Sequence, residues 1–143
     1  MNTVSSTELT LTEDWDKVFP ESDRVNHHKV VFPNRYGIFL AADVYEPKTA
    51  ERKLPAIAIS GSFWAVKEQA SGLYAQKLAE MGYCTLAFDP SFTKESGGFP
   101  RRVASPDINT EDFSAAVDFL SNTDKVDPER IGILGICGFG GMA

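Results

Sequence analysis

Three short apolar segments, separated by two amphipathic helical patterns, constrain the fold of this chain most strongly. Residues 56–60, 83–88 and 130–136 are apolar runs, and residues 69–81 and 111–122 carry apolar residues at helical spacing. Near-continuous apolar runs are typical of strands covered on both faces. Strands that alternate with helices form parallel sheets through right-handed crossovers. The sequence therefore predicts an α/β fold, with a mainly parallel twisted sheet and helices on both faces.

An antiparallel hairpin is predicted ahead of these segments. Residues 28–32 and 38–45 are rich in Val, Ile, Phe and Tyr, and the turn between them contains Pro33 and Gly37. The hairpin adds two antiparallel strands to the N-terminal side of the parallel sheet.

Residues 1–26 are polar and acidic, and we expect them to form a loosely ordered lead-in to a domain that spans residues 27–143. One short turn is expected around Trp15 to Phe19, where the two aromatic side chains pin the lead-in to the domain.

Each predicted helix has an apolar stripe that we expect to face the sheet. In residues 69–81 the stripe consists of Ala70, Leu73, Tyr74, Leu78 and Met81, and Gly82 ends the helix. In residues 111–122 it consists of Phe113, Ala116, Val117 and Leu120, with Asn109 or Thr110 as the N-cap.

The bulk composition excludes several classes of protein. The chain has 143 residues and a net charge of −6, so we expect one domain and no nucleic-acid partner. No apolar run approaches the roughly 20 residues that span a bilayer, and the N-terminus has no signal-peptide pattern. Cys84 and Cys137 each follow apolar strand residues, which favours free thiols in a reducing cytoplasm. We expect no cofactor and no metal.

The segment from residue 130 to residue 141 runs from a strand into a turn with four glycines around Cys137. Such a turn lifts a nucleophile out of a sheet, and a helix that follows it favours the thiolate. The backbone N–H groups of Gly138 and of Ser62, after the strand at 56–60, are candidates for an oxyanion hole. Ligands bind beyond the carboxyl ends of parallel strands, where these residues fall.

The cysteines, the histidines and Asp89 also have structural interpretations. Cys137 as a small buried residue in a tight turn is the less favoured reading, whereas Cys84, inside a strand, is expected to be structural. Asp89, before a proline, is expected to form a turn, and His27 and His28 to be a solvated surface pair. The chain thus offers a nucleophile without an evident base.

Four stretches resemble the α/β-hydrolase superfamily, in the branch of bacterial hydrolases near dienelactone hydrolases and acyl-peptidase-like esterases. They are residues 130–141, 89–98, 60–63 and 112–120. Dienelactone hydrolases also have cysteine at the nucleophile elbow. The resemblance implies that Cys137 attacks a small-molecule acyl substrate (an ester, a lactone or a related compound) while the amides of Gly138 and Ser62 hold the oxyanion.

The chain departs from the family pattern in two ways. Phe139 stands where the elbow has a small residue, and we expect its ring to crowd the turn or the pocket. Family members also continue beyond the elbow, and that part carries the Asp and His of the triad. We therefore expect an incomplete domain that is inactive alone. The family strand order leaves residues 130–136 as an open edge, which favours pairing with the missing half or self-association.

Two alternatives to a hydrolase remain open at this point. The chain is a non-catalytic, truncated relative that associates through its open sheet edge, or residues 138–143 form a G-x-G-x-x-A dinucleotide-binding fingerprint. The fingerprint is disfavoured because it normally opens a complete βαβ unit.

Overall fold

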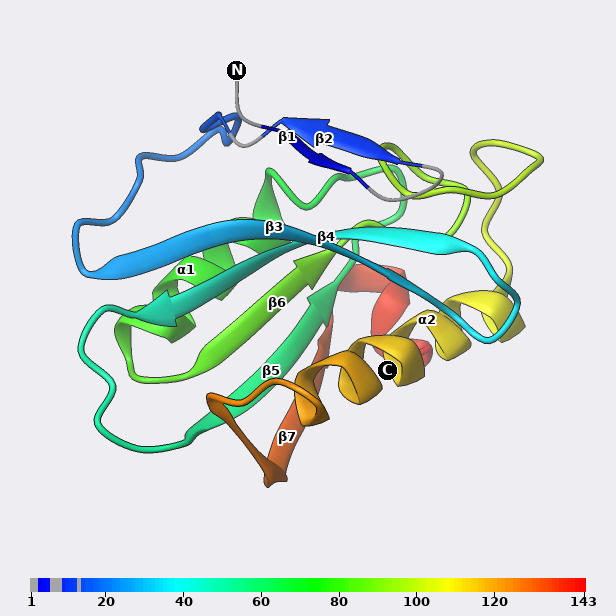
Figure 1. Ribbon diagram of the computed structural model, residues 1–143. Coiled ribbons are helices and arrows are strands. Elements are labelled where there is room, and N and C mark those ends of the chain that lie inside the picture. Colours follow the sequence, from blue (N-terminus) through cyan, green and yellow to red (C-terminus); the bar gives the residue numbers. More distant parts are fainter. Residues whose placement is uncertain (1–2, 6–8, 13) are drawn as a thin grey trace.

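In the computed structural model, which describes residues 3–5, 9–12 and 14–143, a five-stranded mixed sheet forms the centre of the chain (Figure 1). Its strands are β3 (Val25–Pro33), β4 (Phe39–Pro47), β5 (Leu54–Ser60), β6 (Cys84–Phe88) and β7 (Val126–Gly135). The spatial order is β3-β4-β6-β5-β7. β3 and β4 form the predicted antiparallel hairpin, and β6 and β7 both run parallel to β5. The predicted fold class is confirmed, with β7 at one edge.

Two helices cover opposite faces of the sheet (Figure 1). Helix α1 (Ala70–Glu80) connects β5 to β6, and helix α2 (Pro106–Ser121) connects β6 to β7. Alternate residues of the same strand therefore belong to different cores: in β5, Ala58 packs on the α2 side and Ile59 on the α1 side.

The prediction for the buried face of α1 is wrong for Leu73, Tyr74 and Met81, although Leu78 packs against the core as predicted. Leu73, Tyr74 and Met81 are 41%, 53% and 72% exposed. The helix instead buries Ser71, Gly72, Ala75, Gln76 and Ala79. Small residues let α1 lie close to the sheet, since a Cβ on Gly72 would come within 3.1 Å of the Tyr45 hydroxyl on β4 and of the Phe19 ring. The spacing of the large apolar residues therefore indicated the wrong side of the helix.

Helix α2 has the predicted buried stripe but starts earlier than expected. Its N-cap is Ser105, and the expected N-cap residue Asn109 lies buried inside the first turns. The Oδ1 atom of Asn109 accepts a hydrogen bond from the Ser105 N–H at 3.0 Å. Phe113, Ala116 and Leu120 are buried in the core as predicted, and Val117 is half-buried.

The N-terminal lead-in is more ordered than predicted. Strands β1 (Thr3–Ser5) and β2 (Thr10–Thr12) form an antiparallel ribbon that lies beside β3 (Figure 1). The ring of Phe19 is buried against the α1 side of the sheet with Trp15 packed on it, so these aromatic residues do pin the segment. The rest of the expected lead-in includes residues 1–2, 6–8 and 13, which lie outside the described residues. In the described part of the chain, neither helix is long and apolar enough to cross a membrane.

Candidate active site

The chain leaves β7 in a sharp turn at Cys137. Cys137 has a φ of 57°, a left-handed conformation that costs energy for a residue with a Cβ. The N–H of Ile136 still donates to the carbonyl oxygen of Ser60 at 2.9 Å, so sheet pairing continues up to the residue before the cysteine. The thiol is free and the residue exposed. An exposed, strained residue directly after a parallel strand is the geometry of a nucleophile elbow.

The helix expected after Cys137 is replaced by a short 3-10 turn. This turn spans Cys137–Gly141 and is five residues long. A single turn of this kind does not assemble the aligned peptide dipoles on which the expected stabilisation of the thiolate depended. That part of the expectation is therefore not met by the residues described.

Glycine is required at two points of close backbone contact in the elbow. A Cβ on Gly135 would lie 2.3 Å from the carbonyl oxygen of Phe139, and one on Gly61 would lie 2.2 Å from that of Ile136. Both distances are well below van der Waals contact, so only hydrogen fits there. The loop after β5 is thereby held directly against the elbow.

The expectation that Phe139 crowds the elbow is wrong. Its side chain is 2% exposed and belongs to the core on the α2 side of the sheet. Its ring centroid lies 5.2 Å from that of Phe63 and 6.5 Å from that of Phe113. The ring turns into the core, where it also borders the small cavity beside the elbow, and Gly135 makes room for its backbone. Phe139 anchors the turn.

Ser62 lies between two residues that contact the elbow on either side of Cys137. Gly61 touches the backbone of Ile136, and the ring of Phe63 occupies the space beside Gly138, where a Cβ would come within 1.9 Å of it. The three residues predicted for the site, Cys137, Gly138 and Ser62, are thus brought together.

A small cavity borders the elbow and the loop after β5, and most of its lining is apolar. The lining residues are Phe63, Trp64, Pro90, Thr93, Val103, Ala104, Asn109 and Phe139. Trp64 is 66% exposed at its rim.

The histidines do not reach Cys137, because β3 and β7 are opposite edges of the sheet. The side chain of His27 is 7% exposed, and its Nε2 lies 2.7 Å from Oδ1 of Asp43, so the prediction of a solvated pair is wrong for this residue. His28 is exposed as predicted, although partial burial lowers its pKa. Among the described residues, no histidine or carboxylate is hydrogen-bonded to the Cys137 thiol. The described residues therefore place no general base beside Cys137.

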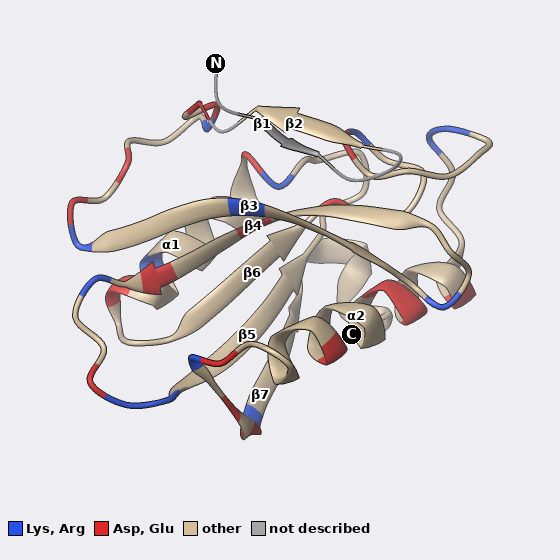
Figure 2. Ribbon diagram, in the orientation of Figure 1, with Lys and Arg blue, Asp and Glu red and all other residues tan. Residues whose placement is uncertain are grey.

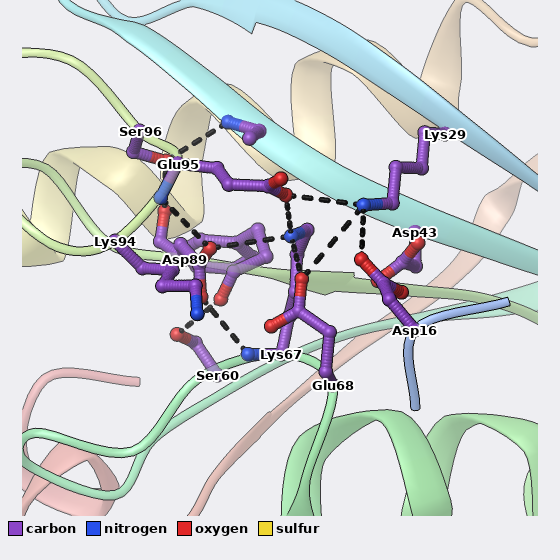
Figure 3. A network of polar contacts seen from close by, with 12 residues as sticks. Asp16, Lys29, Asp43, Ser60, Lys67, Glu68, Asp89, Lys94, Glu95 and Ser96 are labelled. Carbon is purple, nitrogen blue, oxygen red and sulfur yellow. Dashed lines mark hydrogen bonds and ion pairs between the residues drawn. The ribbon is translucent and has the colours of Figure 1, made fainter. Parts of the chain in front are cut away.

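Asp89 is the centre of a buried polar network and not merely a turn former (Figure 3). Its Oδ1 accepts the N–H of Lys67 at 2.9 Å, and its Oδ2 lies 3.3 Å from Nζ of the same lysine. Lys67 Nζ also contacts carboxylate oxygens of Glu68 and Glu95. The Lys67 side chain is fully buried, and its single ammonium group forms ion pairs with three carboxylates.

The network extends from Lys67 toward the N-terminal segment (Figure 3). Lys29, in the middle of β3, lies 2.7 Å from Asp16 and 3.2 Å from Glu95. Lys17 lies 3.0 Å from Asp43 on β4, and both side chains are fully buried. Most other charged residues lie in loops, on the helices or near the ends of strands, as Figure 2 shows. The network therefore ties the lead-in and two strands to the loop after β5.

Burial sets the titration of this network. It raises the pKa of Asp89 to about 6, although Lys67 opposes the shift. Burial disfavours the Lys67 ammonium, but Asp89 and the other nearby carboxylates outweigh that effect and raise the pKa of the lysine. Burial also acts to raise the pKa of Glu95, but Lys67 outweighs it and the pKa is lowered. Lys67 thus keeps its charge at neutral pH.

Asp16, Glu68 and Glu95 are the described residues that come closest to a metal-binding set, with ligand atoms within 4.8 Å of one another. The ammonium groups of Lys29 and Lys67 already lie among these oxygens. The acids are therefore neutralised by lysines, and the cluster does not require a metal ion.

Sequence reasoning missed this network because its members come from separate segments. A signal was present in the strands: Lys29 and Asp43 interrupt otherwise apolar runs, and both are 2% exposed or less. A charged residue inside a buried strand needs a partner, so these two positions could have indicated a buried ion pair.

The sheet order, the elbow and the loop packed against it define part of an α/β-hydrolase fold. The chain belongs to the X-Pro dipeptidyl-peptidase (S15) family, whose model matches residues 36–143. A putative dienelactone hydrolase from Klebsiella pneumoniae, 18% identical with a TM-score of 0.64, shares the fold over 81% of this chain and 51% of its own.

Relatives with higher identity are longer than this chain. The uncharacterized protein PA2218 of Pseudomonas aeruginosa is 67% identical over 95% of this chain and 37% of its own length. Its crystal structure superposes with a TM-score of 0.93, covering 96% of this chain and 43% of that one. The thiohydrolase aneE of Aspergillus aculeatus is 32% identical over 86% of this chain and 38% of its own length. The chain thus spans well under half of these relatives, which support membership of a hydrolase family.

Proposed function

We propose that this chain is the nucleophile-bearing part of a cysteine-dependent hydrolase that acts on esters, lactones or thioesters. The observation that carries the proposal is the position of Cys137, exposed at φ 57° at the end of a parallel strand and flanked by the loop that contains Ser62. The aneE relative, named a thiohydrolase, supports a reaction at an acyl group.

In this reaction the Cys137 thiolate attacks the acyl carbonyl carbon and forms a C–S bond. The carbonyl π electrons move to oxygen, and the oxyanion is held by the N–H groups of Gly138 and Ser62. Collapse of this intermediate breaks the bond to the leaving alcohol or thiol, which takes up a proton. Water then hydrolyses the acyl-enzyme and releases a carboxylic acid and the thiol.

The second half of the cycle needs a general base to activate water. The described residues place no such base at Cys137, so we expect acylation of the 143-residue chain without rapid turnover. The small-molecule acyl group would contact the apolar cavity beside Phe63 and Phe139. We propose a cytoplasmic location, which the two free cysteines support.

We further propose that the open edge of β7 pairs with a strand, supplied either by C-terminal sequence of the kind the longer relatives have or by a second copy. β7 is hydrogen-bonded to β5 on one side, and Ile133 is 43% exposed. An apolar edge with unpaired backbone groups binds other strands readily.

Intact-protein mass spectrometry after incubation with p-nitrophenyl acetate tests the proposed reaction. One acetyl group should be gained per chain, with a single burst of p-nitrophenol and little steady release. Cys137→Ala should abolish the adduct, whereas Cys84→Ala should retain it. A wild-type chain that gains no acetyl group at Cys137 would contradict the proposed nucleophile. Fast steady-state turnover that depends on Cys137 would contradict the expectation that this chain lacks a general base.

A further inference from the structure

We propose that Lys67, clamped to Asp89, is the positioning residue that fixes the oxyanion loop, residues 61–69, against Cys137. The inference rests on the proposed function, because it assigns a role within the same site. It adds the contacts that hold the Ser62 amide in place. These contacts lie outside the elbow.

The oxyanion loop is anchored at both ends. At its start, the Ser71 hydroxyl donates to the Gly61 carbonyl oxygen at 2.6 Å. At its far end, the N–H of Lys67 donates to Asp89. Between them Phe63 packs on Phe139 and Trp64 is 66% exposed. The position of the middle therefore depends on the elbow and on the two ends.

Lys67 holds the far end through two different groups. Its backbone N–H and its Nζ both contact the Asp89 carboxylate, one at each oxygen. Asp89 directly follows β6, so the clamp attaches the loop to a strand in the interior of the sheet. A side-chain contact alone would leave the backbone free to rotate, whereas the paired contact restrains the main chain that leads back to Ser62.

The charge of Lys67 is what keeps the neighbouring acids in place. Its Nζ contacts Glu68 on the oxyanion loop and Glu95 on the loop after β6. Without that ammonium group, Asp89, Glu68 and Glu95 would be three like charges close together, with Lys29 left beside Glu68 and Glu95 and no such partner at Asp89 among the ion pairs of the described residues. They would separate or take up protons, and either response moves the oxyanion loop. The chemistry at Cys137 thus depends on a lysine that does not touch the substrate.

Two reactions of Cys137 distinguish a displaced oxyanion loop from an unfolded chain. Alkylation by iodoacetamide is a displacement at carbon that needs no oxyanion hole, whereas acetylation by p-nitrophenyl acetate passes through an oxyanion. In Lys67→Met we expect acetylation to slow by about 10- to 1,000-fold, up to the range seen when an oxyanion donor is removed. Alkylation should stay within about twofold of wild type. Lys67→Arg should recover part of the acetylation rate.

The matched control is Lys17→Met. Lys17 is a buried lysine of the same network that pairs with Asp16 and Asp43 and does not contact the oxyanion loop. The Lys17→Met substitution should lower thermal stability but leave the ratio of the acetylation rate to the alkylation rate unchanged.

Each outcome decides between the proposals. Equal acetylation of Lys67→Met and wild type overturns the positioning role. A wild-type Cys137 that is alkylated but never acetylated overturns the proposed function instead. If circular dichroism shows that Lys67→Met is unfolded, Asp89→Asn and Glu95→Gln carry the test, with the same fall in acetylation expected in Asp89→Asn. An unchanged rate ratio in both variants overturns the inference.

Discussion

The α-carbon of Gly61 packs directly on the carbonyl group of Ile136, so closely that a methyl group there would lie 2.2 Å from the oxygen. This contact joins the loop after β5 to the residue before Cys137. Gly61 also has a φ of 115°, which residues with a side chain rarely adopt. The close approach and the backbone conformation both require glycine.

Gly61→Ala should therefore destabilise the chain by at least about 2 kcal/mol, because a backbone clash and a strained φ are added together. The free energy of unfolding from urea titration measures the effect. Gly132→Ala, on β7, is the control: its new Cβ would meet no atom within 4 Å, and its stability should equal or exceed that of wild type. Equal stability of Gly61→Ala and wild type would show that the contact is not kept in solution.

Phe139→Ala should cost about 3–5 kcal/mol, the range for truncating a buried phenylalanine. The ring fills the core between Phe63 and Phe113, and no other side chain can take its volume. Phe99→Ala serves as the comparison, because Phe99 is 88% exposed and its loss should change stability by less than about 0.5 kcal/mol. Similar losses in the two variants would mean that Phe139 does not anchor the elbow.

Cys137 and Cys84 should differ sharply in thiol reactivity. Cys84 is buried in β6, and burial raises its pKa to about 12, whereas Cys137 is exposed. The folded chain should release one equivalent of thionitrobenzoate from a disulfide reagent, and two in denaturant. Cys137→Ala should react only after unfolding. Labelling of Cys84 in the folded chain would contradict the burial of this residue in β6.

The stability of the wild type should fall relative to Asp89→Asn as the pH rises from 4 to 7. The pKa of Asp89 is raised from 3.8 to about 6 in the folded state, so the folded state binds this proton more tightly than the unfolded state does. The resulting stabilisation is complete below pH 3.8 and is lost as the pH passes 6. A shift of this size corresponds to about 3 kcal/mol. Thermal unfolding of both proteins across this range gives the difference, and a pH-independent difference would contradict it.

Ile133→Lys should reduce self-association if the edge of β7 pairs with a second copy. A lysine on an exposed sheet edge blocks strand pairing. Light scattering at increasing concentration should show larger species for wild type than for this variant. Tyr36→Lys removes another exposed apolar side chain, away from β7, and should leave association unchanged. A wild-type chain that stays monomeric would exclude pairing between copies.

The positions of the strands and the elbow could be predicted because both are local properties of the chain, whereas the strand order came from the family resemblance. Apolar runs mark β5, β6 and β7, and glycines around Cys137 mark the turn, without reference to distant residues. The buried face of α1 could not be predicted in this way. Its contacts are set by how closely the helix approaches the sheet, and small residues such as Gly72 decide that distance.

The polar network was beyond prediction for a related reason. Asp89 before a proline is a common turn pattern, and nothing local indicates that it will accept two hydrogen bonds from Lys67. Ion pairs between distant segments appear only once the sheet has formed. Phe139 was misjudged similarly: its size was known from the sequence, but the direction of its side chain was not.

The buried network also bears on the order in which the molecule folds. Its charges come from the lead-in, the hairpin, the oxyanion loop and the loop after β6, and each is costly to bury until its partners arrive. The apolar strands β5, β6 and β7 carry none of these charges, whereas the hairpin and the loop beside Cys137 need their ionic partners. Reactivity at the thiol should therefore be acquired late in folding, after secondary structure is complete, and the N-terminal segment around Asp16 belongs to the same late step.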